Sequence, residues 1–145
     1  MYYLFPVRPI NSFLADLYRM TENEISFIIR GCAFRVYNKL GPGLLESVYE
    51  RALSHELKAE GLIVINQVGI PMSYDDLSFD NGFRLDILVN DQVIIEVKSV
   101  EALIDIHYKQ LLTYLKLTGK KLGLLINFNT NSLDKNSIIR IVNNL

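Results

Sequence analysis

The segment from Gly82 to Lys98 constrains the fold most, because both of its halves alternate apolar and polar side chains. Alternation with a period of two is typical of half-buried strands. We therefore predict an antiparallel hairpin whose loop is Asn90, Asp91 and Gln92. The side chains expected on its apolar face are Phe83, Leu85, Ile87 and Val89 in the first arm and Val93, Ile95 and Val97 in the second.

The register of this hairpin decides which polar residues meet. Matching the two apolar faces pairs Val89 with Val93, Ile87 with Ile95, and Leu85 with Val97. Opposed residues of an antiparallel pair share a face, so Asp86 then lies opposite Glu96, and Arg84 opposite Lys98. Opposed like charges destabilise a bare sheet. The two carboxylates are therefore either a rim wetted by solvent or a cation site, and an arrangement unfavourable for stability is a candidate for function.

Composition limits the class of protein. The chain has 145 residues, 50% of them apolar and 21% charged, which indicates one globular domain and excludes a disordered or fibrous class. A net charge of −1 and a pI of about 6.1 give no general attraction to nucleic acid or anionic lipid. Any contact with nucleic acid must therefore be made through a local patch.

Cysteine and hydropathy indicate the compartment. The single cysteine, Cys32, excludes an internal disulfide and a cysteine-based zinc site, and we interpret it as a buried apolar side chain in a reduced cytoplasm. No stretch approaches the length of a membrane span, and the N-terminus lacks the pattern of a signal peptide. We expect a cytoplasmic protein with no membrane partner.

The domain is predicted to cover residues 20–145. Residues 1–19 fit neither helical nor strand periodicity and contain two prolines, so we expect an appendage there, with Met20 as the biological start. Thr21 and Glu24 have the spacing of a capping box and predict a helix that runs to Lys39. Its apolar positions at helical spacing are Ile25, Ile28, Ile29, Cys32, Val36 and Leu40.

Two further helices carry candidate polar residues. The first runs from Leu44 to about Gly61, with Glu46 and Tyr49 three residues apart and able to point at a common place. Its predicted buried stripe is Leu45, Val48, Ala52 and Leu53. The second helix covers 106–118. Its apolar side is Tyr108, Leu111, Leu112 and Leu115, and its polar stripe is His107, Gln110 and Tyr114.

The remaining strands complete an α/β architecture. We predict strands over 62–65 and 70–74, the second at a sheet edge because Pro71 cannot donate a ladder hydrogen bond. Turns are expected at 75–76 and 80–82. The apolar run 122–126 predicts a buried strand, and 138–142 a short final one.

The polar residues of the hairpin suit metal-assisted hydrolysis. Mg²⁺ prefers oxygen ligands, usually one or two carboxylates with water and substrate phosphate, and Asp86 and Glu96 can supply them. Lys98 lies one pleat beyond Glu96 on the same face. It could hold a water molecule or neutralise charge that grows on a phosphate. The matching reaction is hydrolysis of a phosphodiester by an activated water.

Two motifs resemble known families. Asp86 followed by Glu96-Val97-Lys98 resembles the PD-(D/E)xK nuclease superfamily, whose core is a mixed sheet flanked by helices. Gly43-Leu-Leu-Glu46-Ser-Val-Tyr49 is similar to the motif that names the GxxExxY family, and the similarity extends from about Met20 to the end of the chain. Leu85 stands where the superfamily's name has proline, a position that the superfamily keeps only loosely.

The resemblance implies roles for these residues. It implies metal ligation by Asp86 and Glu96, with help from the Val97 carbonyl and Glu46, and catalysis by Lys98. It places Gln110 and Tyr114 at the rim of the site. The implied fold is a single-domain restriction-endonuclease-like core, and the implied cofactor is Mg²⁺, with Mn²⁺ as a substitute.

We therefore expect a Mg²⁺-dependent nuclease that acts on nucleic acid, DNA rather than RNA. Arg84, Tyr49 and Lys109 are the candidate substrate-binding residues. The cations that would form a phosphate track, if they share a face, are Arg84, Lys98, Lys109, Lys116, Lys120 and Lys121. The alternative is a non-catalytic module that keeps the fold and binds nucleic acid or protein. A homo-oligomer is compatible with either.

Each candidate also has a structural interpretation. Glu46 could complement the dipole of its helix. Lys98 could be a solubilising strand end, and Tyr49 could serve core packing. Gln110 and Tyr114 could be ordinary residues of a helix surface.

Overall fold

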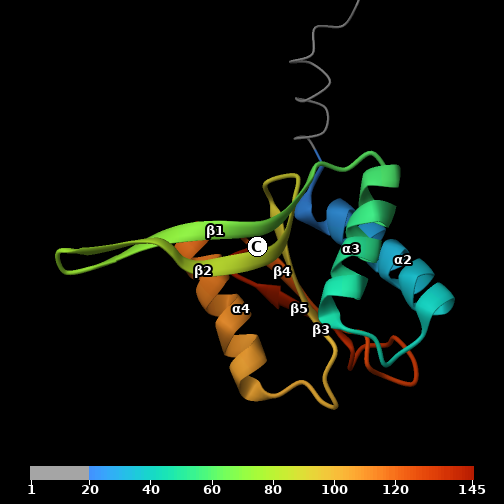
Figure 1. Cartoon of the computed structure of the whole chain (residues 1–145). Coiled ribbons are helices and arrows are strands. Elements are labelled where there is room, and N and C mark those ends of the chain that lie inside the picture. The colour runs from blue at the N-terminus through green and yellow to red at the C-terminus, as the bar shows by residue number, and fades with distance from the viewer. Residues whose placement is uncertain (1–19) are drawn as a thin grey trace, which may run out of the picture.

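The computed structural model describes residues 20–145 as one mixed sheet with helices on both faces (Figure 1). The predicted appendage over residues 1–19 lies outside the described residues. The helices are α2 (Glu22–Leu40), α3 (Glu46–Ala59) and α4 (Asp105–Thr118). The strands are β1 (Val64–Tyr74), β2 (Leu77–Val89), β3 (Val93–Lys98), β4 (Leu122–Asn127) and β5 (Ile138–Val142). The predicted α/β fold class is confirmed.

Strand order follows chain order, β1-β2-β3-β4-β5. Only β3 and β4 are parallel, and α4 makes the crossover between them. The other neighbours are antiparallel. Both parallel strands are almost wholly buried, as is expected of strands covered on both faces.

Two apolar cores lie on opposite faces of the sheet. One lies beneath α2 and α3 and is built around Ile29, Tyr49 and Ile95. The other lies beneath α4 and contains Ile94, Leu111 and Leu115.

The predicted start of the first helix is confirmed. Thr21 caps α2, its Oγ1 accepts a hydrogen bond from the Glu24 amide, and the Thr21 amide donates to Glu24 Oε2. These reciprocal bonds satisfy two amides that a helix start leaves unpaired. Cys32 is buried, as predicted, in the apolar core beneath α2 and α3.

The predicted buried stripe of α3 is wrong at its beginning. Leu45 is 73% exposed and Val48 is exposed as well. Leu45 precedes the helix as its N-cap, and the buried face is set by Tyr49, whose ring stacks on Phe128 at a centroid distance of 4.6 Å. Leu53 is buried, as expected.

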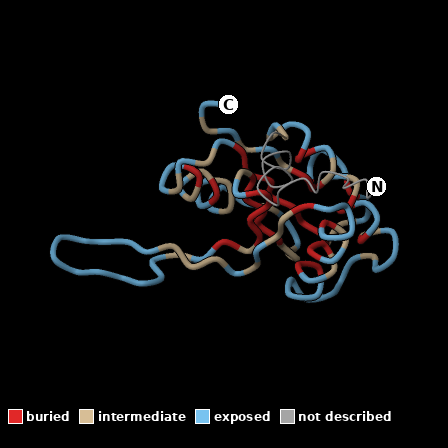
Figure 2. Tube along the Cα trace, turned by 90° about the horizontal axis from the view of Figure 1, so that it is seen from above, coloured by how far each residue is buried: buried red, intermediate tan, exposed pale blue. Residues whose placement is uncertain are grey.

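The two short strands predicted over 62–65 and 70–74 form one long edge strand, β1. Its partner β2 begins at Leu77, so the turn predicted at 80–82 is wrong, whereas the turn at 75–76 is confirmed. Together β1 and β2 form a ribbon whose outer part projects well beyond the body of the molecule and is exposed along its length (Figure 2).

The predicted apolar face of the hairpin is wrong for Leu85 and Phe83, which both pack in the core beneath α4. The loop at 90–92 and the pairs Ile87–Ile95 and Val89–Val93 are confirmed. Leu85, however, belongs to the core beneath α4, whereas Ile87 belongs to the core beneath α2 and α3. The strand changes face at Asp86, so Leu85 does not share a face with Val97, and the paired ladder ends at Ile87–Ile95.

Candidate active site

Asp86 and Glu96 meet where the β2–β3 ladder ends. The amide of Val97 donates a hydrogen bond to Asp86 Oδ2 at 2.8 Å, and the amide of Asp86 donates to Glu96 Oε1 at 3.3 Å. Each carboxylate therefore accepts a bond from the opposite strand in place of a ladder bond. The predicted meeting of these two side chains occurs in this form, at the open end of the hairpin.

Burial makes this pair costly to ionise fully. Burial, followed by the charge of Asp86, raises the pKa of Glu96 to about 8. Burial also raises the pKa of Asp86, and the charge of Glu50 adds to that effect. The Lys98 ammonium lowers the pKa of both carboxyl groups, but by less than burial raises it. Glu96 therefore keeps a proton at neutral pH, and the charge of Lys98 is not enough to ionise the pair fully.

Lys98 is the last residue of β3 and is half-buried. Its carbonyl accepts a hydrogen bond from Phe128 at 2.9 Å, which fixes the backbone of this strand end against the segment after β4. Val97 is buried, and its amide is the donor to Asp86. The Glu96-Val97-Lys98 triplet is therefore anchored on both sides by backbone hydrogen bonds.

Glu46 reaches the same region from the first turn of α3. Its Oε1 accepts a hydrogen bond from the Ser99 amide at 3.2 Å, and the Ser99 hydroxyl donates to the Leu44 carbonyl at 2.6 Å. Glu46 and Asp86 line one open cleft of about 560 Å³. The helix start is thus fastened to the residue that follows Lys98.

The structure adds two residues that the sequence analysis did not assign. Glu50 and Gln67 line the same cleft as Asp86. Both Glu50 carboxylate oxygens accept hydrogen bonds from Gln67 Nε2, at 3.0 and 2.8 Å, and Oε1 also accepts one from Asn66 Nδ2. Glu50 lies four residues after Glu46, on the same helix face, and that spacing was the available signal.

Gln67 has a backbone angle that is unusual for a strand. Its φ is +53°, a left-handed value that is rarely adopted by residues other than glycine, and the register on either side places it opposite Asp86. Both strands therefore depart from regular geometry at the same level. Strain of this kind clusters at functional sites.

Gln110 and Tyr114 lie on α4, one turn apart. Gln110 Nε2 donates to the Tyr114 hydroxyl at 2.6 Å, and the Tyr114 ring stacks on Phe83. Burial, followed by the charge of Glu96, raises the pKa of Tyr114. The tyrosine therefore lies within electrostatic reach of the acidic pair.

The predicted substrate-binding residues occupy different environments. Arg84 and Lys109 are exposed. Tyr49 is fully buried, so its side chain does not meet solvent. Its hydroxyl donates to the Gly41 carbonyl at 2.5 Å and accepts from the Leu44 amide at 3.1 Å. Tyr49 thus positions the loop before Glu46, and its predicted contact with substrate is corrected to this role.

The predicted phosphate track does not extend to all six cations. Lys98 pairs in register with Asn127 at one end of the parallel strands, whereas Lys120 and Lys121 precede the other end. Lys120 forms an ion pair with Asp91 at 2.9 Å. These two lysines therefore cannot share a surface with Lys98.

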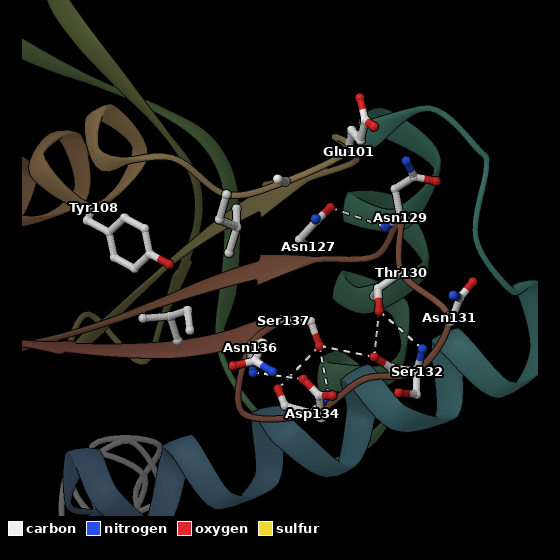
Figure 3. A pocket seen from close by; sticks show the side chains of 13 residues that line it. Glu101, Tyr108, Asn127, Asn129, Thr130, Asn131, Ser132, Asp134, Asn136 and Ser137 are labelled. Atoms are coloured by element: carbon white, nitrogen blue, oxygen red, sulfur yellow. Dashed lines mark hydrogen bonds between the residues drawn. The ribbon is translucent and has the colours of Figure 1, made fainter.

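A polar hollow of about 660 Å³ lies beside the end of β4 (Figure 3). Its side chains are largely engaged with one another: Asn127 bonds both backbone groups of Val100, and the Ser137 hydroxyl donates to the Ser132 and Asp134 carbonyls. None of the predicted site residues lines it. We therefore treat it as loop structure rather than as part of the active site.

One comparison with known proteins gave a match. A family model described as the PD-(D/E)XK nuclease superfamily matches residues 23–141, from α2 to β5. The chain belongs to this superfamily. Searches of curated proteins and of solved structures gave no match. The narrower resemblance to the GxxExxY family stays a prediction.

Membership of the PD-(D/E)XK superfamily points to nuclease activity on nucleic acid and to a divalent metal cofactor. The donor set fits such an ion in part. Asp86 and Glu96 are adjacent oxygen donors, which is the number of carboxylates that a hard divalent cation usually takes. Within residues 20–145, no group of three His, Cys, Asp or Glu side chains is close enough to hold a metal. Glu46 therefore does not complete a three-carboxylate cluster with the pair.

The described part of the chain, residues 20–145, contains no helix that is both long enough and apolar enough to cross a bilayer.

Proposed function

We propose that this member of the superfamily is a Mg²⁺-dependent nuclease that hydrolyses phosphodiester bonds in nucleic acid and acts on DNA in preference to RNA. The observation that carries the proposal is the pair of the half-buried Asp86 and the buried Glu96 beside Lys98, in which each carboxylate accepts a hydrogen bond from a backbone amide of the opposite strand. Strongly raised carboxyl pKa values mark candidate functional sites, and a cation that displaces the proton would offset the charge of the two adjacent carboxylates. If the pair had only a structural role, nothing would offset the loss of stability that comes from placing two carboxyl groups side by side.

In this proposal Asp86, Glu96 and the Val97 carbonyl would hold the ion, and Glu46 would assist from the cleft wall. When bound, Mg²⁺ would stabilise negative charge on the phosphate and make a nearby water more acidic. Lys98 orients that water and offsets charge on the scissile phosphate. Glu50, through its bonds to Gln67, positions the strand opposite Asp86 and is a positioning residue.

The substrate would lie across the open end of the hairpin, where the cleft between Glu46 and Asp86 is accessible. Arg84 would contact the substrate backbone from β2, and Lys109 would do so from α4. Gln110 and Tyr114 would form the rim, because they are hydrogen-bonded to each other and the charges of Glu96 and Asp86 reach the tyrosine, whose pKa they help to raise after burial. The cytoplasm is the compartment that we expect for this activity.

A panel of labelled substrates tests the proposal. Single-stranded, duplex and branched DNA and the matching RNAs are incubated with the full chain in Mg²⁺, in Mn²⁺ and in EDTA. We expect cleavage with either metal, none in EDTA, and DNA cut faster than RNA. Metal-independent cleavage that survives in Asp86→Asn would refute the assigned site.

Residues 20–145 contain no three-carboxylate cluster, which favours one alternative, a module that binds nucleic acid without cleaving it. Metal-dependent binding without any product, across the same panel and with metals up to millimolar concentration, would establish that alternative.

A further inference from the structure

The outer part of the β1–β2 ribbon presents an uncovered apolar face. The register pairs Met72 with Phe79 and Tyr74 with Leu77. Opposed residues share a face, and so do residues two apart in one strand. These four large side chains therefore form one continuous surface, which we call the arm face. They are 38%, 48%, 69% and 59% exposed, respectively.

The arm face continues the surface that α4 covers. Ile70 and Phe83 pack in the core beneath α4. The β1–β2 register shifts between Ile70 and Met72, and beyond this shift Met72 lines a groove against that helix together with Phe83. The groove has a volume of about 450 Å³, and its α4 wall includes Ile106 and Leu117, both more than half exposed. Core and arm face are thus one apolar strip, of which only the inner half is covered.

A two-stranded ribbon with one apolar face is marginally stable alone in water. The opposite face at this level carries Ser73 and Ser78, so the ribbon has no second apolar contact. An exposed apolar surface of this kind is typical of a binding site, so we expect the arm face to be covered by a partner.

Charge excludes nucleic acid and anionic lipid as that cover. Between Gly69 and Gly82 the chain has three acids, Asp75, Asp76 and Asp80, and no lysine or arginine. An acidic tip is repelled by phosphate groups. A matching partner must offer an apolar surface with a cation at one end.

The molecule itself offers such a surface. The groove at the base of the ribbon joins apolar Met72, Phe83, Ile106 and Leu117 to the ammonium of Lys109. Five arm residues extend about 17 Å and the α4 axis about 21 Å, so the arm of one molecule is long enough to lie along the groove of another. Placed tip to base, the acidic turn of each arm reaches Lys109 of the other copy.

We propose that the arm face is a self-association surface, on which the arms of two copies pack against each other about a two-fold axis. Each arm covers the groove and arm face of the other copy, so that every contact occurs twice. The groove includes Lys109, Gln110 and Tyr114, which the proposed nuclease also uses, but the mass of the chain is measured without substrate and therefore tests self-association separately from cleavage.

The test measures the mass of the full chain by sedimentation and light scattering over a concentration series. We expect a reversible dimer of the 16.6 kDa chain. Tyr74→Ser/Phe79→Ser should shift it to monomer, whereas the control Ser73→Thr/Ser78→Thr, on the opposite face, should leave the dimer intact. A monomer at every concentration, or a dimer that is unchanged in the Tyr74/Phe79 variant, would overturn the proposal.

A charge exchange tests the tip-to-base arrangement. Asp76→Lys and Lys109→Glu should each raise the dimer dissociation constant about tenfold, and the two changes in one chain should restore it. Dimers whose dissociation constant responds to neither change would contradict this arrangement. Loss of DNA binding in the Tyr74/Phe79 variant without loss of the dimer would assign the arm to nucleic acid instead and overturn the proposal.

Discussion

The backbone amide of Asp86 donates a hydrogen bond to the carboxylate of Glu96, across the point where the β2–β3 ladder ends. Because the Val97 amide binds Asp86 in return, neither carboxylate can turn away without leaving a buried amide unpaired. The two acids are thus held together by the backbone, in a geometry that the chain maintains despite its electrostatic cost.

This geometry predicts a pH dependence of stability. The pKa of Glu96 is raised from an ordinary value of 4.5 to about 8, so the folded state retains a proton that the unfolded state releases between these values. The free energy of unfolding without metal should therefore fall as pH rises from about 4.5 to 8 and then level off. Urea denaturation in EDTA at several pH values measures this. In Glu96→Gln the fall should be smaller, because only the raised pKa of Asp86 remains to produce it.

Metal binding should release a proton near neutral pH. A cation displaces the proton that Glu96 holds below its pKa of about 8, so about one proton should leave at pH 7 and fewer at pH 9. Titration calorimetry of Mg²⁺ or Mn²⁺ in buffers of different ionisation enthalpy counts these protons. Equal release at both pH values would show that Glu96 is not a ligand.

Divalent metal should also stabilise the fold. At a concentration of 100 times the dissociation constant, binding linkage adds about 2.7 kcal/mol to the free energy of unfolding. Asp86→Asn/Glu96→Gln should lose this gain, whereas Glu101→Gln/Asp105→Asn, which removes the same charge from exposed positions, should keep it. Identical melting shifts in the two double variants would place the ion elsewhere.

The hydroxyl of Tyr49 should matter for stability. Tyr49→Phe keeps the ring stacked on Phe128 but removes the bonds to Gly41 and Leu44. We expect the free energy of unfolding to fall by about 1–3 kcal/mol. The exposed Tyr74 provides a matched control, in which the same change should cost less than about 0.5 kcal/mol.

The sequence predicted those parts of the fold in which local pattern and burial agree. The capping box at Thr21, the buried strand over 122–126 and the 90–92 loop each rest on a local signal, and each is confirmed. Strict alternation failed at Leu85 because it assumes a regular strand. The left-handed conformation of Gln67, across from Asp86, follows from tertiary contacts with Glu50 that no local pattern encodes.

The site was predictable to the same degree. The register inferred from the alternating side chains was enough to predict that Asp86 lies opposite Glu96. In the structure each of the two carboxylates accepts a hydrogen bond from the other residue's strand. Helical spacing placed Glu46 and Tyr49 on one face, beside the predicted buried stripe, but could not show that the Tyr49 ring stacks on Phe128 in the core. Glu50 was not assigned to the site, because a glutamate early in a helix can be explained by its favourable interaction with the helix dipole.

Single-turnover cleavage of the best substrate in Mg²⁺, by the full chain and by Lys98→Met, tests the central claim most directly. Lys121→Met is the control, since Lys121 lies at the opposite end of the same parallel strand pair. We predict that Lys98→Met lowers the cleavage rate at least about 100-fold with substrate binding retained, and that Lys121→Met cleaves at the rate of the natural chain. Equal rates for all three proteins would contradict the account.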